Sequence, residues 1–254
     1  MVLGRWLVVL GVLVFGGSTL TLLPAAWIAD HLEQRFPALT VGVSRGTLGG
    51  GELRNIQLAD GRLDAVGWRW QPTELFAAAL GFAIDAQGPE LAFEGRVALG
   101  PTGELTLSHW RGRAALGQLL ALAGQPAALV AAQVVFDLDR IQLAAHGAPL
   151  DARGEVELRA VQTRLGDPLP LGDFALALEG GADDGSLRGN LRDLGGPLAL
   201  TGHLTLERSG RYRVEATLRA REQADPKLKQ LIPLLAPPQP DGSTVLRHSG
   251  QWAR

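Results

Sequence analysis

The chain of 254 residues is 46% hydrophobic and carries a formal net charge of −2 at pH 7. This length accommodates one large domain or two modest ones. Because the net charge is close to zero and the Lys and Arg residues form no patch, we expect no nucleic acid partner. The sequence contains no cysteine, which excludes disulfides, thiol catalysis and thiolate metal sites.

The N-terminal part of the chain has no charged residue between Trp6 and Ala29. About 24 helical residues at ~1.5 Å each span ~36 Å, more than the ~30 Å hydrocarbon core of a bilayer. Trp6 and Trp27 lie near the two ends of this segment, where aromatic rings favour the membrane interface. Arg5 precedes the segment and Asp30 follows it, so the charge bias predicts a cytoplasmic N-terminus and a remainder outside the cytoplasm.

A cleaved signal peptide is the alternative, because residues 2–17 alone contain a basic start followed by an apolar region. The apolar run continues to Ile28, however, and no Ala-x-Ala cleavage signal follows it cleanly. We therefore predict an uncleaved anchor and a single-pass membrane protein. Residues 1–36 would form the cytoplasmic N-terminus, the anchor and a juxtamembrane segment, and residues 37–254 a β-rich domain.

Beyond residue 37, apolar and polar residues alternate with the period of two that is typical of half-buried strands. Glycines separate these runs where turns are needed. The pattern predicts an all-β dominated fold with strands near 40–44, 53–58, 62–70, 82–86, 90–99, 103–110, 134–146, 150–165, 173–179, 186–192, the two arms of a hairpin within 195–218, and 243–252.

Three short helices are expected between these strands. Thr73 can cap a helix at 74–80 that Gly81 ends, and a helix at 113–123 ends at Gly124. Residues 126–133 are apolar and compatible with either a helix or a strand. The third helix has Asp225 as its cap and Pro226 at its first position. Its apolar residues follow the i, i+3, i+4, i+7 pattern: Leu228, Leu231, Ile232 and Leu235. The proline at position 233 would kink this helix or end it early.

In the hairpin at 195–218, the loop and the cross-strand side-chain pairs predict the same register. A three-residue loop at 208–210 pairs Leu206 with Tyr212 and requires a positive φ at its third residue, Gly210. The same register pairs Leu204 with Val214 on the apolar face. On the polar face it places Glu207 opposite Arg211 and His203 opposite Glu215, each pairing contributing ~0.2–1 kcal/mol.

Candidate chemical groups are few. The five histidines are His31, His109, His146, His203 and His248, and none has a spacing typical of metal ligands. For His109 and His203, which fall on predicted strands, a solvated position is the simpler interpretation. Asp137 and Asp139 point the same way from one strand, and Asp183 and Asp184 are adjacent. Such pairs can serve acid–base chemistry or bind cations, but a polar strand face and a turn explain them more simply.

Nucleophile and phosphate-binding motifs are not expected either. Ser209 and the pair Ser243 and Thr244 lack the G-x-S-x-G context of an activated serine. The glycine-rich stretch at 46–51 lacks the Lys-Ser/Thr that follows a phosphate loop, so we interpret it as a tight bend or bulge between strands. We predict no catalytic, cofactor-binding or metal-binding residues, and hence a protein that is not an enzyme.

Trp68 and Trp70 share one face of a predicted strand, just before a helix cap. Packing in the core beside that helix is the simpler interpretation, and docking of a partner is the alternative.

Several segments, taken in order, resemble protein N of the type II (general) secretion pathway, the GspN family. They are an N-terminal apolar segment, Gly-Thr-Leu starting at Gly46, W-x-W-x-P-x-x-L at 68–75, a Leu-rich helix ending in Gly-x-Pro at 116–126, and G-G-P-L-x-L-x-G-x-L-x-L followed by G-x-Y at 195–212. An Arg-containing strand end, the Leu-rich helix near 228–235 and a closing Asp-Gly hairpin continue the likeness. Gly50 departs from the first motif, where a larger residue is expected.

The resemblance implies a bacterial inner-membrane protein with a periplasmic domain that belongs to the machine exporting folded proteins across the outer membrane. Family members are accessory components without known enzymatic activity, and their fold is similar to the AsmA-like β-groove proteins. A long, curved antiparallel sheet with one apolar face must cover that face with a second layer and helices, or curl and leave a groove. An apolar groove of this kind could hold lipid.

Two functions of different class follow. The first is a structural or interaction subunit whose partners are other, unidentified type II secretion subunits, with the bilayer contacted through the N-terminal helix. The second is a membrane-tethered protein that binds or shuttles lipid in an apolar groove. The two differ in whether the face of Leu204, Leu206, Tyr212 and Val214 is packed or open. A carbohydrate-active enzyme using Asp137 and Asp139 is not favoured.

Overall fold

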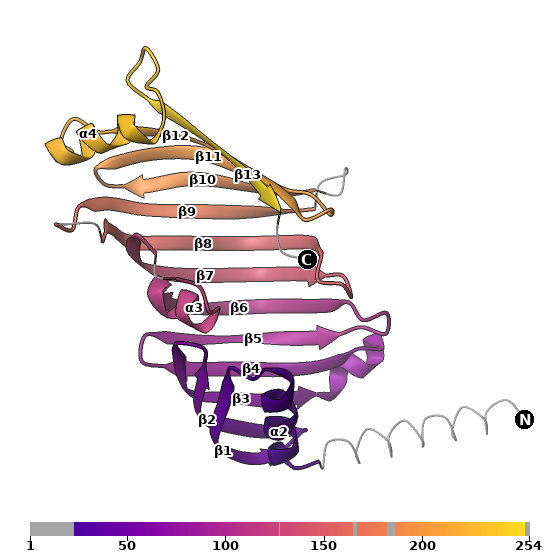
Figure 1. Ribbon diagram of the computed structural model, residues 1–254. Coiled ribbons are helices and arrows are strands. Elements are labelled where there is room, and N and C mark those ends of the chain that lie inside the picture. Colours follow the sequence, from indigo (N-terminus) through magenta and orange to yellow (C-terminus); the bar gives the residue numbers. More distant parts are fainter. Residues whose placement is uncertain (1–22, 127, 165–166, 182–185, 252–254) are drawn as a thin grey trace, which may run out of the picture.

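The computed structural model describes residues 23–126, 128–164, 167–181 and 186–251. Thirteen strands in these residues form a single antiparallel sheet in which the strands follow one another in chain order (Figure 1). The strands are β1 (Leu39–Thr47), β2 (Gly50–Leu58), β3 (Gly61–Gln71), β4 (Leu80–Gly88), β5 (Leu91–Leu99), β6 (Leu105–Ala115), β7 (Val130–Leu143), β8 (Pro149–Thr163), β9 (Pro170–Gly181), β10 (Leu187–Gly195), β11 (Leu198–Leu206), β12 (Arg211–Ala220) and β13 (Thr244–Gln251).

Each of these strands overlaps one that the alternation of apolar residues predicts, so the β-dominated fold is confirmed. The undecided stretch at 126–133 joins β7 from Val130 onward. Between the strands, the described residues form the helices α2 (Ala25–Arg35), α3 (Leu116–Leu122) and α4 (Pro226–Leu235) and the short 3-10 helix η1 (Pro72–Ala77). The described residues contain no second sheet layer, so the helices alone cover the sheet.

The first two helix predictions need correction. The predicted helix at 74–80 is η1, which begins at Pro72 and ends where Ala78 adopts a left-handed φ of 55°. Gly81 lies in β4 and does not end a helix; a Cβ atom there would overlap the Glu74 side chain, so glycine lets Glu74 pack across the strand. The second helix begins at Leu116, because residues 113–115 still pair within β6. Its end at Gly124, with a φ of 63°, is as predicted.

The third helix, α4, has the predicted start. The Asp225 carboxylate accepts a hydrogen bond from the backbone N–H of Lys227 at 2.7 Å, and Pro226 occupies the first position. Only part of the predicted apolar stripe faces the sheet: Leu228 and Ile232 are buried, whereas Leu231 is 43% exposed. The helix therefore contacts the sheet through a narrow face. It ends at Leu235, two residues beyond the proline inside it.

Helix α2 is the element that the sequence did not predict. Most of the uncharged segment at 6–29 lies outside the described residues, but its last residues form the start of α2. Ala25 and Ala29 are buried, and Ala29 packs against Leu53 and Ile56 of β2. The last residues of the predicted membrane span therefore pack on the sheet, and the span itself stays a prediction. No helix within the described residues is long and apolar enough to cross a bilayer.

β-Bulges disturb the strict alternation of faces in several strands, including β6, β7 and β8. An extra residue enters β6 at His109, where φ is 53°, β7 at Asp139, and β8 at Ala160, where φ is 50°. Each bulge returns two apolar residues three positions apart to the same face: Leu107 and Trp110, Leu138 and Ile141, Leu158 and Val161. Bulges bend the strand that carries them and increase its twist, which suits a long sheet with one apolar face.

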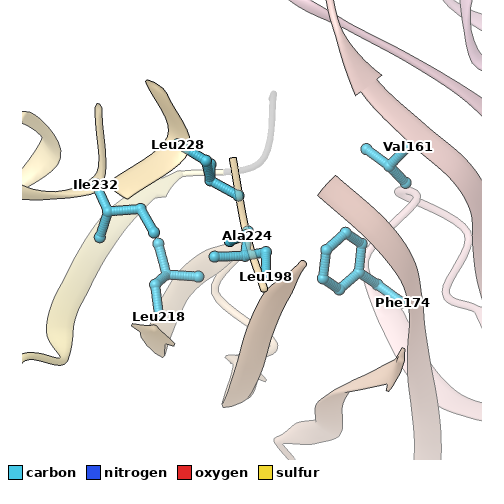
Figure 2. Close-up of a cluster of buried hydrophobic side chains, with 7 residues drawn as sticks. All are labelled: Val161, Phe174, Leu198, Leu218, Ala224, Leu228 and Ile232. Carbon is cyan, nitrogen blue, oxygen red and sulfur yellow. The ribbon is translucent and has the colours of Figure 1, made fainter. Parts of the chain in front are cut away.

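Three hydrophobic clusters lie along the apolar face, each beside a helix. Ala29 of α2 joins the first on β1–β3, and Leu119 and Leu122 of α3 pack against the second around Ala86, Leu91 and Ala114. The third cluster is the largest (Figure 2), and combines strands β8, β9, β11 and β12 with α4: Val161, Phe174, Leu198, Leu218, Ala224, Leu228 and Ile232. The helices thus bury the apolar face only at their own positions along the sheet.

The hairpin of β11 and β12 has the predicted register. Leu206 pairs with Tyr212, Leu204 with Val214 and His203 with Glu215. Gly210 has a φ of 80°, and its N–H donates to the Glu207 carbonyl at 2.9 Å. The three-residue loop is therefore confirmed.

Candidate functional site: an open apolar face

Cross-strand partners of an antiparallel pair share a face, so the strand register reveals which side chains lie together. Residues that are paired from one strand to the next form rows that cross the sheet. One such row of residues runs from β4 to β13, and a neighbouring row on the same face runs from β3 to β13. The first row is Ala86, Phe93, Gly112, Phe136, Val156, Leu176, Leu191, Gly202, Ala216 and Leu246. The second is Trp68, Ile84, Gly95, Trp110, Leu138, Gly154, Leu178, Gly189, Leu204, Val214 and His248. We call the large apolar side chains of these two rows the open apolar face.

The open apolar face is neither packed away nor fully exposed. Its members from Ile84 to Val214 are half-buried in the middle of the sheet. Helix α2 contacts β1 and β2, α3 contacts β3, β6 and β7, and α4 contacts β12 and β13, so each helix covers only part of this surface. Within it, the Phe93 ring stacks on Trp110 at a centroid distance of 5.1 Å and contacts Phe136 at 6.5 Å.

Glycines explain how a single-layer sheet partly covers this face by itself. A Cβ atom at Gly51 would lie 2.5 Å from the Trp68 ring, and one at Gly95 would lie 2.6 Å from the Trp110 ring. The Tyr212 ring lies over Gly250 in the same way. Aromatic rings therefore lie flat over glycines of the neighbouring strand, which hides ring surface from water without a second layer.

The apolar face of the β11–β12 hairpin is packed at one end and open at the other. Leu198 and Leu218 are buried in the α4 cluster, whereas Leu204, Leu206, Tyr212 and Val214 are half-buried. The hairpin thus changes along its length from a core strand pair to part of the open apolar face.

The opposite face of the sheet is polar and carries a ladder of ion pairs. Arg111 Nε lies 2.9 Å from Asp137 Oδ1, Arg192 pairs with Glu155 at 2.6 Å, and Arg247 pairs with Glu215 at 3.1 Å. The hydrogen bond from Arg247 lowers the pKa of Glu215 below its ordinary value. Such exposed pairs contribute little stability individually, but they keep this face hydrated and the other face distinct.

The candidate carboxylates lie on this polar face. Asp137 is exposed and ion-paired with Arg111, and Asp139 is exposed at the β7 bulge. Asp183 and Asp184 lie outside the described residues. The two serine candidates are turn residues: the Ser209 hydroxyl donates to Glu207 at 3.0 Å, and the Ser243 hydroxyl donates to Asp241 at 2.7 Å. Thr244 is fully buried, and its hydroxyl has no hydrogen-bond partner.

The histidines are distributed over the molecule. His31 stacks on Trp27 at 5.4 Å, and His248 lies 3.1 Å from the Tyr212 hydroxyl. His109 is in the β6 bulge, His146 in the β7–β8 turn, and His203 on the polar face opposite Glu215. Within the residues that the structure describes, no three His, Asp or Glu side chains are grouped as metal ligands would be.

Two of the recognised sequence motifs meet at one end of the sheet. The turn between β1 and β2 contains Leu48 and Gly49, which confirms the tight bend expected for the glycine-rich stretch. The indole N–H of Trp68 donates to the Thr47 and Leu48 carbonyls at 3.1 and 3.0 Å, while the N–H of Trp70 donates to the Gly49 carbonyl at 2.8 Å. Trp68 also packs beside the cluster that contains Ala29 of α2. Its packing against other apolar side chains is therefore as predicted, but the helix in that cluster is α2 and not the predicted helix at 74–80.

Replacing Trp68 by phenylalanine tests the role of the indole N–H. Phenylalanine keeps an aromatic ring but removes the indole N–H that the two carbonyls share, together with the indole atoms Cζ2 and Cη2 over Gly51. We therefore expect the free energy of unfolding to fall by at least about 1–3 kcal/mol. Urea unfolding of the purified chain measures this loss. An unchanged midpoint would show that the two carbonyls find water instead.

The G-G-P motif at 195–197 is held by a carboxylate and an arginine that sequence reasoning missed as partners. Asp193 Oδ1 accepts from Arg221 Nη2 at 2.6 Å and from the Gly195 N–H at 3.2 Å, and Oδ2 accepts from the Leu200 N–H at 3.1 Å. Arg221 Nη1 donates to the Gly196 carbonyl at 2.6 Å. Burial raises the pKa of Asp193, but the hydrogen bonds from Arg221 and the two backbone N–H groups outweigh this effect and lower the pKa below its ordinary value.

A lowered folded-state pKa means that Asp193 stabilises the fold above its unfolded pKa and loses this contribution as the pH falls through the folded value. We expect Asp193→Asn to lower the free energy of unfolding by about 1–2 kcal/mol at pH 7, in the lower part of the range for charged hydrogen bonds. The Arg221 side chain is 39% exposed, so water screens the pair. The difference from the wild type should shrink below pH 4 in urea unfolding followed across pH. An equal difference at pH 3 and pH 7 would contradict this role.

The family model for "Type II secretion system (T2SS), protein N" matches residues 37–247, which include β1–β12 and the first half of β13. No curated protein and no solved structure matches the chain. The match confirms the resemblance and covers most of the chain. The chain belongs to the protein N family of the type II secretion system.

Proposed function

We propose that this protein is a non-enzymatic accessory component of the type II secretion system, anchored in the bacterial inner membrane by its N-terminal segment, with the sheet in the periplasm. The observation that carries the proposal is the family match across the sheet. The uncharged segment before Leu23 supports the anchor, and the charge bias around it supports the orientation. Asp137 occupies an ion pair, and Ser209 and Ser243 occupy turns, which supports a role in contacts.

The open apolar face is the surface that we assign to partner contacts. Large exposed apolar surfaces on soluble domains mark interaction sites for proteins or lipids. A photo-crosslinking amino acid at Leu178, on this face, and a matched one at the exposed residue Glu179, which follows it in the strand, test the assignment in living cells. We expect Leu178 to capture a secretion subunit, identified by mass spectrometry, and Glu179 to capture less. Absence of any secretion subunit at both positions would contradict the proposal.

Binding of lipid acyl chains is the second candidate function, and the same half-buried aromatic surface favours it. Phe93, Trp110 and Phe136 present ring surface that acyl chains could cover. A photo-crosslinker at Phe93 should then yield an adduct with the mass of a phospholipid, and one at Glu94, on the polar face, should not. Equal lipid adducts at both positions, or none, would exclude a lipid site on this face.

A further inference from the structure

The connection between β3 and β4 carries a short apolar segment that faces solvent. Residues 75–80, which we call the apolar loop, read Leu-Phe-Ala-Ala-Ala-Leu and contain no polar side chain. Phe76 is 95% exposed, and Leu75 and Leu80 are also exposed. Leu80 pairs across the strands with the exposed Leu99 of β5, which extends the patch. An apolar patch held in water in this way marks a contact with another molecule or with a membrane.

The apolar loop is held in one conformation. The N–H of Ala78 donates to the Leu75 carbonyl and that of Ala79 to the Glu74 carbonyl, both at 3.0 Å. Ala78 has a left-handed φ of 55°, and the Glu74 side chain packs over Gly81. Phe76 therefore projects from a hydrogen-bonded turn whose Glu74 side chain packs on β4, and its exposure is built into the fold.

The apolar loop lies at the end of the sheet where the chain enters the fold. The N–H of Leu48 donates to the Leu23 carbonyl at 2.8 Å, and the neighbouring Gly49 carbonyl accepts from Trp70 at 2.8 Å. The first residue of η1 follows two positions after Trp70. In Figure 1 the start of α2 and the connection between β3 and β4 both lie at the right-hand end of the strands. Trp27, in the first turn of α2, is 53% exposed.

The sequence before Leu23 identifies what covers the loop. From Trp6 onward it carries no charge, which suits a bilayer as its surroundings. A domain joined to such a segment through a few residues is held with this end close to the membrane surface. Exposed Phe, Leu and Trp side chains at that end match the aromatic and aliphatic composition of the bilayer interface.

We propose that the apolar loop inserts into the periplasmic leaflet of the bilayer that holds the N-terminal segment, so that this end of the sheet rests on the membrane and the strands lead away from it. The proposal depends on the membrane anchoring put forward above. It gives the protein a second membrane contact, centred on Phe76. This contact fixes the orientation of the open apolar face relative to the bilayer.

Because the chain contains no cysteine, Phe76→Cys places a single thiol on the full-length protein for labelling with the polarity-sensitive fluorophore NBD. The labelled protein is reconstituted into phosphatidylethanolamine and phosphatidylglycerol vesicles with and without doxyl-labelled lipid. Asp60→Cys, in the exposed β2–β3 turn at the opposite end of the strands, is the matched control. We expect a blue-shifted emission and loss of fluorescence on doxyl quenching at position 76, and neither effect at position 60.

A second probe tests whether the apolar side chains drive insertion. With NBD at Ala77→Cys, quenching should be lost when Phe76 and Leu80 are both replaced by serine. Flotation of the vesicles reports anchoring independently of the probe. Flotation without quenching at position 77 in the protein that keeps Phe76, or equal quenching at 76 and 60, would overturn the loop proposal alone. Failure to float would overturn the anchor and, with it, the loop insertion.

Discussion

Replacing Phe174 by alanine is expected to lower the free energy of unfolding by about 3–5 kcal/mol, because it removes a buried aromatic ring and leaves a cavity. The side chain is 8% exposed and lies in the cluster that joins β8, β9, β11 and β12 with α4 (Figure 2). Urea unfolding of the purified full-length chain, followed by circular dichroism, measures the change. Leu194→Ala is the control, because Leu194 is 40% exposed on the neighbouring strand β10.

The control should change the free energy of unfolding by no more than about 0.5 kcal/mol, as is usual for surface positions. Equal losses for Phe174→Ala and Leu194→Ala would show that the cluster does not hold α4 on the sheet. A large loss for Phe174→Ala alone would identify the α4 cluster as the principal core of the C-terminal half.

Replacing Gly51 by valine is expected to cost about 3 kcal/mol, at the upper end of what overpacking costs. A Cβ atom there would lie 2.5 Å from Cζ2 of Trp68 and 2.6 Å from the Arg45 carbonyl oxygen. The ring can escape only by leaving the two carbonyls to which its indole N–H donates. Thermal unfolding measures the loss, and tryptophan fluorescence should report a displaced ring.

Gly50→Ala is the matched control for this substitution. A Cβ atom at Gly50 would meet nothing closer than the Trp68 carbonyl oxygen at 3.8 Å, which is ordinary van der Waals contact. The neighbouring glycine should therefore tolerate alanine with little change in the melting temperature. If both variants melted alike, the cover of Trp68 over Gly51 would not be a determinant of stability.

The strands could be predicted from the sequence because each has one solvated face, which imposes an alternation that no helix shares. The three-residue loop at 208–210 was predictable for a further reason. Its glycine and its cross-strand charges require the same register, and the structure has that register. The start of α4 was equally local, since Asp225 and Pro226 act within one turn.

The features that could not be predicted from the sequence depend on contacts between residues that are distant in the chain. Helix α2 was not predicted because Ala25 and Ala29 are as suitable for a membrane span as for packing on β2. The bulge at Ala160 carries no residue signal, and it is recognised only because Leu158 and Val161, three positions apart, return to one face. The pairing of Asp193 with Arg221 joins residues 28 positions apart, which no local pattern indicates.

The open apolar face belongs to this second group. Each of its strands was predicted to have an apolar side, but whether a second layer covers that side is decided by the topology of the sheet. Trp68 and Trp110 were recognisable as large apolar residues, whereas the glycines beneath them acquire a meaning only through the register. The exposure of the apolar loop could not be predicted either, because residues 74–80 are as typical of a packed helix as of an exposed turn.

A role in type II secretion is tested most directly by deleting the gene in the bacterium that carries it and measuring exoproteins in the culture medium, together with assembly of the apparatus. We predict that the deletion strain releases less of the type II substrates or assembles fewer complete machines, and that a plasmid copy of the gene restores both. Secretion and assembly that remain intact in the deletion strain would contradict the proposed function.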